Sequence, residues 1–212
     1  MRIFNDAHIP GRHSNSTLNS FEYTSHPDLA RAWMGARTVL TTWNADVECR
    51  GLVLWGPVGT GKTHLMVGVI RELIFQHGVT ARFAEFSHLL ADLKAGFETG
   101  SGASQLVTDL IEVQILAIDE LGKGRNTEWE GTVLDELISR RYNAAATVLA
   151  TTNYGPEATG RATPNLSTGA MPGLPDRVPD RVFSRLLDLC EFFGMPGEDW
   201  RRRRLAPATR MS

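Results

Sequence analysis

Residues 51–63 read Gly51-Leu-Val-Leu-Trp55 and then Gly56-Pro-Val-Gly-Thr-Gly-Lys-Thr63. The first five form a short apolar run, which is typical of a strand buried in a parallel sheet. The next eight match the Walker A pattern, G-x-x-x-x-G-K-[ST]. His64–His77 then carries apolar residues at helical spacing. A strand, a glycine-rich turn and a helix in this order predict a phosphate-binding loop at a helix N-terminus, the alternative being a chance match in a glycine-rich turn.

The residue types of this loop indicate a nucleoside triphosphate and Mg²⁺ as its ligands. Its glycines let the backbone curl so that successive N–H groups point at phosphate oxygens. Lys62 adds positive charge at the β- and γ-phosphates, and the Thr63 hydroxyl is suited to ligate Mg²⁺. The residues predicted to bind ATP are Gly56, Pro57, Val58, Gly59, Thr60, Gly61, Lys62, Thr63 and His64.

A second apolar run ends in two carboxylates. Ile115–Ile118 is followed by Asp119 and Glu120, which is a Walker B pattern. Parallel strands carry their ligands at their carboxyl ends, so we expect Asp119 to hold the Mg²⁺ shell together with Thr63. Glu120 is predicted to orient or deprotonate the water that attacks the γ-phosphate. The alternative for Glu120 is a solvated residue at a strand end.

One amide is a further candidate for this site. Asn153 follows a predicted strand at Thr147–Thr151. If that strand lies beside the two strands already described, Asn153 reaches the same crevice and can hydrogen-bond the γ-phosphate or the attacking water. Asn also ends many strands because of its turn preference, which is the alternative reading.

Phosphoryl transfer also needs positive charge on the transition state. Arg181 and Arg185 are four residues apart on a helix predicted at Val178–Cys190, so they lie on one face of it. Either side chain is placed to reach the nucleotide of a neighbouring subunit. The alternative is a solvated basic face with surface ion pairs, such as one between Arg185 and Asp188.

Strands and helices alternate along most of the chain. Strands are predicted at 51–55, 79–86, 113–118 and 147–151, and a closing strand is expected to begin near 191–193. Helices are predicted at 27–40, 64–77, 89–97, 105–111, 127–143 and 178–190, with Ser87 capping the third of them. This alternation predicts the α/β fold of a P-loop NTPase, with a five-stranded parallel sheet sandwiched by helices.

We expect three segments. Residues 1–45 form an N-terminal arm and first helix, 46–205 the ATP-binding domain, and 206–212 a C-terminal tail. Residues 154–177 are rich in Gly, Pro, Thr and Asn and lack periodicity, which predicts a flexible insertion. Such an insertion either has no role or binds a partner.

Composition excludes several classes of protein. The 212 residues carry a net charge of −2, so any contact with nucleic acid must come from a local patch. No apolar stretch approaches the ~18 residues of a membrane span, and the N-terminus lacks the apolar core of a signal peptide. Cys49 and Cys190 show no metal spacing and are expected to be reduced thiols, Cys190 being buried on a helix face. We therefore predict a cytoplasmic protein without a membrane partner.

These motifs resemble those of AAA+ ATPases, and more narrowly those of DnaC/DnaI-type replicative helicase loaders and IstB-type transposition ATPases. The resemblance extends over most of the chain, from His8 to Arg202. Beyond the Walker A octet, its carriers are Ile9–Phe21, Ile118–Gly122, Arg141-Tyr142, Ala150–Asn153, Asp180–Arg185 and Gly197–Arg201.

The resemblance implies several roles. Asn153 corresponds to a sensor position, and Arg185 to an arginine finger that completes the ATP site of a neighbouring copy, so the active form would be a homo-oligomer. The helices between Leu89 and Ile111 correspond to an insert that helps relatives grip single-stranded DNA. Lys94 is the one basic residue there, so Arg201–Arg204 is the stronger candidate for phosphate contacts, unless it is a solvated chain end. No C-terminal lid domain is expected.

Three functional hypotheses remain open at this level. The first is a slow, partner-stimulated ATPase that acts in DNA replication, resembling a loader of the replicative helicase on single-stranded DNA. The second is a transposition ATPase that coats DNA and recruits a transposase. The third is a monomeric small-molecule kinase, which the Asp119-Glu120 pair disfavours because a kinase needs no activated water. The fifty residues before Gly51 are too few for a separate helicase-binding domain, so no partner surface is assigned.

Overall fold

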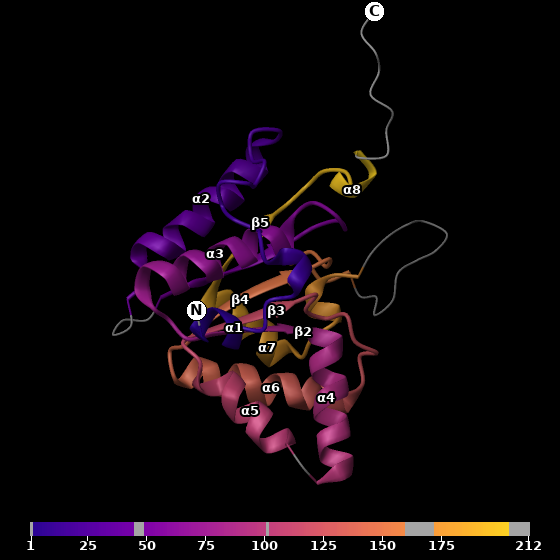
Figure 1. Cartoon of the computed structure of the whole chain (residues 1–212). Helices are drawn as coiled ribbons and strands as arrows, with labels where there is room; N and C mark the ends of the chain where they lie inside the picture. Colours follow the sequence, from indigo (N-terminus) through magenta and orange to yellow (C-terminus); the bar gives the residue numbers. More distant parts are fainter. Residues whose placement is uncertain (1, 45–48, 101, 160–171, 204–212) are drawn as a thin grey trace, which may run out of the picture.

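The computed structural model describes residues 2–44, 49–100, 102–159 and 172–203. The tail predicted at 206–212 and the middle of the predicted insertion lie outside this range. The strands form one parallel sheet in the order β2-β3-β4-β1-β5 (Figure 1), which confirms the predicted five-stranded sheet. They are β1 (Gly51–Trp55), β2 (Ala81–Glu85), β3 (Ile115–Asp119), β4 (Thr147–Thr152) and β5 (Cys190–Gly194).

Helices cover both faces of the sheet (Figure 1). One face packs against α1 (Arg2–Asp6), α2 (Pro27–Thr42) and α3 (Lys62–His77). The other packs against α4 (Phe86–Thr99), α5 (Ala103–Glu112), α6 (Glu128–Asn143) and α7 (Asp180–Leu189). Short elements complete the chain: η1 (Gly11–His13), η2 (Leu174–Asp176) and α8 (Trp200–Arg203). None of the helices in the described part of the chain is long and apolar enough to cross a membrane.

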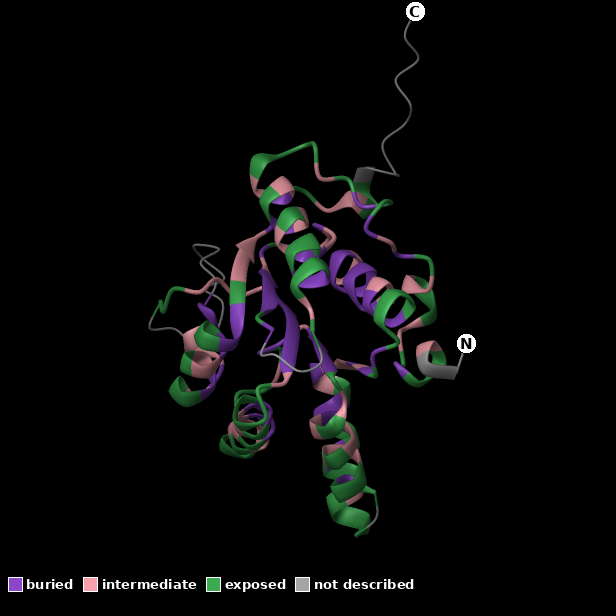
Figure 2. Cartoon of the chain, turned by 90° about the vertical axis from the view of Figure 1, so that its left-hand side faces the viewer, coloured by how far each residue is buried: buried purple, intermediate pink, exposed green. Residues whose placement is uncertain are grey.

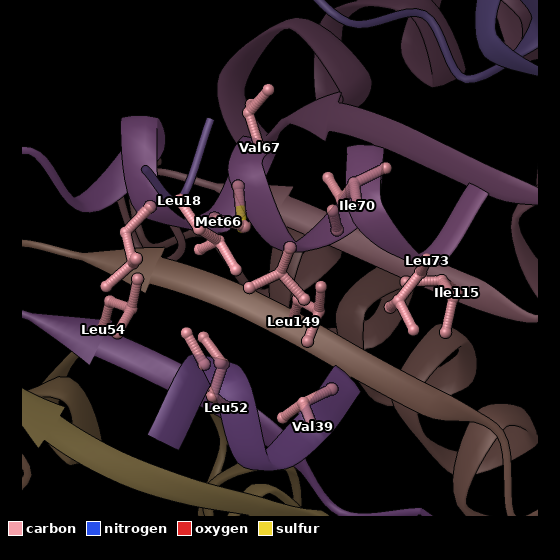
Figure 3. Packing of buried hydrophobic residues seen from close by; sticks show 14 of the residues in the cluster. Leu18, Val39, Leu52, Leu54, Met66, Val67, Ile70, Leu73, Ile115 and Leu149 are labelled. Atoms are coloured by element: carbon pink, nitrogen blue, oxygen red, sulfur yellow. The ribbon is translucent and has the colours of Figure 1, made fainter. Parts of the chain in front are cut away.

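The alternation of side chains along each strand divides the core into two clusters. Leu52 and Leu54 face α3, where they join Met66 and Ile70 (Figure 3). Val53, between them, faces the opposite cluster under α6 and α7. Burial of each Leu or Ile side chain stabilises the folded state by about 1.5–3 kcal/mol. Figure 2 shows that buried residues concentrate on the sheet and on the helix faces that pack against it. The sheet is therefore a rigid base for the residues at its edge.

Strand order brings the motifs together. β4 lies between β1 and β3, and all three run in the same direction. Their carboxyl ends therefore meet at one edge, which carries the phosphate loop, Asp119 and Asn153. Ligands of open α/β sheets bind at this kind of edge.

Two local predictions were wrong. α4 begins at Phe86 and is capped by Glu85, whose carboxylate accepts from the Ser87 N–H at 3.3 Å, so Ser87 is not the cap. Cys190 begins β5 instead of ending α7, because its extended backbone pairs with Gly51 of β1. Both cysteines are buried free thiols, and the Cys190 thiol donates to the Val148 carbonyl at 3.3 Å.

The N-terminal arm packs tightly on the domain. Ala7, Leu18 and Phe21 are buried in the same cluster as α3. The Phe83 N–H of β2 donates to the Ala7 carbonyl at 2.8 Å. A side chain at Gly68 of α3 would place its Cβ 3.0 Å from the Leu18 nitrogen, so this glycine permits close approach of the arm. The arm is therefore part of the folded core.

The two ends of the predicted insertion lie side by side. Gly155 and Gly173 form an isolated parallel bridge. The Thr159 N–H donates to the Asp176 carboxylate at 2.7 Å. The Arg177 guanidinium donates to the Gly122 carbonyl at 3.0 Å, which ties this region to the loop after β3. The insertion therefore starts and ends at one point of the fold.

Candidate ATP site and an adjoining groove

The loop between β1 and α3 has the backbone of a phosphate cradle. Gly59 and Gly61 have φ angles of 81° and 93°, a left-handed conformation that favours glycine. At Gly59 a Cβ would lie 2.0 Å from a carboxylate oxygen of Asp199, so a side chain is also excluded by space. The loop leads directly into the N-terminus of α3, where unpaired N–H groups favour an anion.

Lys62 is buried within this loop. Its ammonium donates to the carbonyls of Gly56 at 2.8 Å and Pro57 at 2.6 Å. Burial lowers the pKa of Lys62 to about 8, although Asp119 and Glu120 act in the opposite direction. A cation that burial has deprived of water gains strongly from a phosphate partner, which suits the role predicted for Lys62.

Thr63 and Asp119 meet at the foot of the loop. The Thr63 hydroxyl donates to Asp119 Oδ1 at 2.8 Å. Burial raises the pKa of the Asp119 carboxyl, and hydrogen bonds from Thr151 and Thr63 lower it. Mg²⁺ takes oxygen ligands and usually keeps several waters beside one or two protein groups and the substrate phosphates. These two oxygens therefore fit Mg²⁺, and they are the groups that would hold it.

Thr151 organises both carboxylate residues, and sequence reasoning missed it. Its hydroxyl donates to Asp119 Oδ1 at 2.5 Å and accepts from the Glu120 N–H at 3.0 Å. Thr151 belongs to the Ala150–Asn153 segment, but only the pairing of β3 with β4 shows that its side chain reaches across. No pattern along the chain carries that information.

Glu120 is the first residue after β3, and its backbone is left-handed, with φ at 57°. A non-glycine residue in this region is uncommon and often marks a functional site. Its side chain is about one-third exposed and forms an ion pair with Lys123. Glu120 therefore stands at the mouth of the cradle, where water has access.

The structure places Asn153 at the predicted edge. β1 and β4 pair up to Trp55 and Thr152, and the Gly56 N–H donates to the Thr152 carbonyl at 3.2 Å. Asn153, half-buried, is therefore next to the start of the phosphate loop.

Arg185 contacts α6. Its guanidinium pairs with Asp135 at 2.6 Å and lies 6.0 Å from the centre of the Tyr142 ring. The pairing with Asp188 weighed from sequence was wrong, because Asp188 accepts from the Tyr142 hydroxyl at 2.8 Å. Arg181 on the same helix is exposed.

Two segments far from the loop in sequence border it, which sequence reasoning also missed. The Trp200 N–H donates to the Gly59 carbonyl at 3.1 Å, and Arg201 is close enough to contribute to the lowered pKa of Lys62. On another side, the His64 ring lies 2.9 Å from the Ser20 hydroxyl and 3.0 Å from the Thr17 carbonyl. The His64 ring thus contacts the arm, and Arg201 belongs to the surroundings of the phosphate loop.

A groove of about 780 Å³ opens between α4 and the start of α6, and we call it the α4–α6 groove. Lys94 and Phe97 contribute from α4, Lys123 and Arg125 from the loop after β3, and Trp129 from α6. Phe97 is 55% exposed and Trp129 37%. The groove therefore combines aromatic faces with three cationic side chains and two carboxylates, those of Glu98 and Glu130.

Comparison with known proteins agrees with this geometry. The model of one protein family, described as IstB-like ATP binding protein, matches residues 2–159. The chain belongs to this family. Its relatives and structural neighbours include both insertion-sequence ATP-binding proteins and DnaC helicase loaders, so the predicted resemblance is confirmed, and with it membership of an ATP-binding AAA+ clade.

The individual relatives are distant. An ATP-binding protein in an insertion sequence of Mycobacterium tuberculosis is 28% identical over 68% of this chain and 55% of its own length. The replicative helicase loader DnaC of Escherichia coli is 24% identical over 68% of this chain and 57% of its own length. This IstB-like chain thus spans little more than half the length of these two relatives. A crystal structure of the DnaC helicase loader superposes with a TM-score of 0.74 at 24% identity, covering 88% of this chain and all of that one.

Proposed function

We propose that this IstB-like protein is a Mg²⁺-dependent ATPase that assembles through ATP at its subunit interfaces and acts in DNA replication as a helicase loader-like factor. The observation that carries the ATPase assignment is the 2.8 Å contact between the Thr63 hydroxyl and Asp119, with Glu120 next in the chain. A metal-binding pair and an adjacent carboxylate at one sheet edge are what hydrolysis by an activated water requires.

Each residue of the site has a role in this proposal. The loop amides and Lys62 bind the triphosphate, and bound Mg²⁺ supplies positive charge at the β- and γ-phosphate oxygens. Glu120 accepts a proton from the attacking water, which Asn153 helps to orient. Arg185 of an adjacent copy stabilises the charge that develops on the γ-phosphate, so ATP holds the two copies together and hydrolysis releases them.

The α4–α6 groove supports single-stranded DNA as a partner. Exposed aromatic rings stack on unpaired bases, and cationic side chains bind the phosphates between them. Lys94 and Arg125 have no ion-pair partner among the described residues, so both charges are available to phosphates. The sequence view that Lys94 is the one cation of this region was incomplete, because Lys123 and Arg125 reach the groove from the loop after β3.

Hydrolysis is tested with Glu120→Gln. This variant keeps the shape of the side chain but removes the base. We expect it to bind ATP with unchanged affinity and to hydrolyse it at least ~100-fold more slowly, the usual range for loss of a general base. Binding is measured by calorimetry and hydrolysis by phosphate release. Turnover at the wild-type rate would remove Glu120 from this role.

DNA binding is tested with Trp129→Ala. Loss of one stacking partner is expected to weaken binding of a fluorescent oligothymidylate by roughly 5- to 160-fold, the effect of about 1–3 kcal/mol. The control is Phe75→Ala, which removes an exposed aromatic ring on α3, a helix that packs on the opposite face of the sheet. Equal affinity of the wild type and Trp129→Ala proteins would contradict the assignment of the groove to DNA.

Transposition is the second candidate. The family match and the insertion-sequence relative favour it. The DnaC-like fold is compatible with both helicase loading and transposition. The family gives no support to a small-molecule kinase. A pull-down from the native cells with a non-hydrolysable ATP analogue separates the two: a replicative helicase in the eluate supports loading, and a transposase supports transposition.

A further inference from the structure

Lys123 contacts both the candidate ATP site and the α4–α6 groove. Its ammonium forms an ion pair with Glu120 Oε2, and the same side chain lines the α4–α6 groove. The backbone fixes this arrangement, because the Lys123 N–H donates to the Glu120 carbonyl at 3.0 Å and Gly122 between them has a φ of 82°. A four-residue turn therefore joins the carboxylate of the ATP site to the α4–α6 groove.

The ion pair restrains the carboxylate. A general base needs a free lone pair aimed at the water whose proton it accepts. While Lys123 occupies Oε2, that oxygen is not free to accept from water, and the Glu120 carboxylate is held toward the groove.

The contact is weak enough to exchange. The Lys123 side chain is 54% exposed and that of Glu120 33%. An ion pair this exposed shifts an equilibrium by only about 2- to 5-fold. Lys123 is charged near neutral pH, since Glu120, Glu85 and Asp119 all raise its pKa. A phosphate in the groove, carrying its own charge and flanked by Lys94 and Arg125, competes for the same ammonium.

We propose that Lys123 is a positioning residue that couples the groove to the ATP site: it restrains Glu120 when the groove is empty, and a nucleic-acid phosphate draws it away, which frees Glu120 for hydrolysis. This inference rests on the proposed function, in which Glu120 is the base and the groove takes single-stranded DNA.

The test is the rate of ATP hydrolysis by the full chain with and without oligothymidylate. Without DNA, Lys123→Gln is expected to raise kcat by about 2- to 5-fold with no change in the KM for ATP. Saturating DNA should then add little further rate. Lys123→Arg keeps a cation and should restore both the low basal rate and the response to DNA. A role limited to folding or to DNA affinity would not produce this rescue together with a raised basal kcat.

Two comparisons isolate the effect. Arg140→Gln breaks another exposed ion pair, with Glu136 on α6, and should leave the basal rate unchanged. Lys94→Gln removes a groove cation that does not contact Glu120, so it should raise the DNA concentration needed for half-maximal stimulation and keep the full stimulation at saturation. A basal rate of Lys123→Gln equal to that of an active wild type overturns the coupling, as does a wild type that DNA fails to stimulate. A wild type with no ATP hydrolysis under any condition overturns the proposed function itself.

Discussion

The buried charge of Lys62 lowers the stability of the folded protein. Burial lowers its pKa to about 8, below its ordinary value, so the folded state binds fewer protons than the unfolded state from about pH 8 to ~10.4. Stability therefore rises with pH through this window, and the cost of the buried charge is complete below it. In the proposed function, this destabilising charge is the one that binds the phosphates of ATP.

We predict that Lys62→Met is more stable than wild type at pH 7 by about 1–2 kcal/mol and that this gain shrinks toward pH 10, while ATP affinity is lost. Urea unfolding at both pH values measures the first effect, and calorimetric titration with ATP the second. Lys94→Met, at an exposed position, should change stability little at either pH. A less stable Lys62→Met at pH 7 would mean that the hydrogen bonds to Gly56 and Pro57 outweigh the burial.

Thr151 supports Asp119 through its hydroxyl oxygen. Thr151→Val keeps the shape of the side chain but removes the hydrogen bond that lowers the pKa of Asp119 and orients its carboxylate. We expect the Mg²⁺ concentration for half-maximal ATP hydrolysis to rise about tenfold, as for other supporting residues of metal sites. Thr151→Ser retains the hydroxyl and should behave like wild type. An unchanged Mg²⁺ requirement in Thr151→Val would show that Asp119 needs no such support.

At the scale of elements, one arginine joins α6 to the amino-terminal ends of two strands. Arg141 is fully buried and donates to the carbonyls of Ile111, Val113, Gln114 and Thr147, before β3 and at the start of β4. Burial lowers its pKa to about 10, so it stays charged at neutral pH. Its four acceptors offset the cost of burying the charge.

We predict that Arg141→Leu lowers the free energy of unfolding by about 3–5 kcal/mol, because it leaves buried carbonyls without donors. Denaturant unfolding followed by circular dichroism measures this. The neighbouring Arg140→Leu is the matched control, since its exposed pair with Glu136 should be worth less than about 1 kcal/mol. Similar losses in the two variants would contradict the role of Arg141 as a buried connector.

The elements themselves were predictable where a period or a motif defines them. Apolar runs located β1, β3 and β4, because these strands are buried on both faces of the sheet. Helical spacing of apolar residues located α3 and α6. Contacts between neighbouring strands and between neighbouring helices were not predictable from the chain. Thr151 on Asp119 and Asp135 on Arg185 depend on strand order and helix packing, and neither leaves a sequence period. Cys190 was assigned to the wrong element because an apolar residue at a helix–strand junction suits both.

At the scale of the whole molecule, the ATP site is bordered by segments from the entire chain. The arm contacts His64, the first residue of α8 contacts Gly59, and the edge of the sheet supplies Asp119 and Asn153. Arg185, by contrast, pairs with Asp135 on α6. In the proposed assembly Arg185 completes the ATP site of a second copy, and this role can be tested directly.

That test mixes two inactive proteins. Arg185→Ala keeps Glu120 but offers no finger, and Glu120→Gln keeps the finger but has no base. If the finger acts between copies, a site on the first protein beside a copy of the second is complete, so an equal mixture should recover about a quarter of the wild-type hydrolysis rate, the chance of that arrangement at a head-to-tail interface. The control is Arg181→Ala. This variant should hydrolyse ATP by itself, without the second protein, because the proposal assigns the finger to Arg185 and not to Arg181. A mixture that gives no more than the sum of its separate components would show that Arg185 does not serve a neighbouring site.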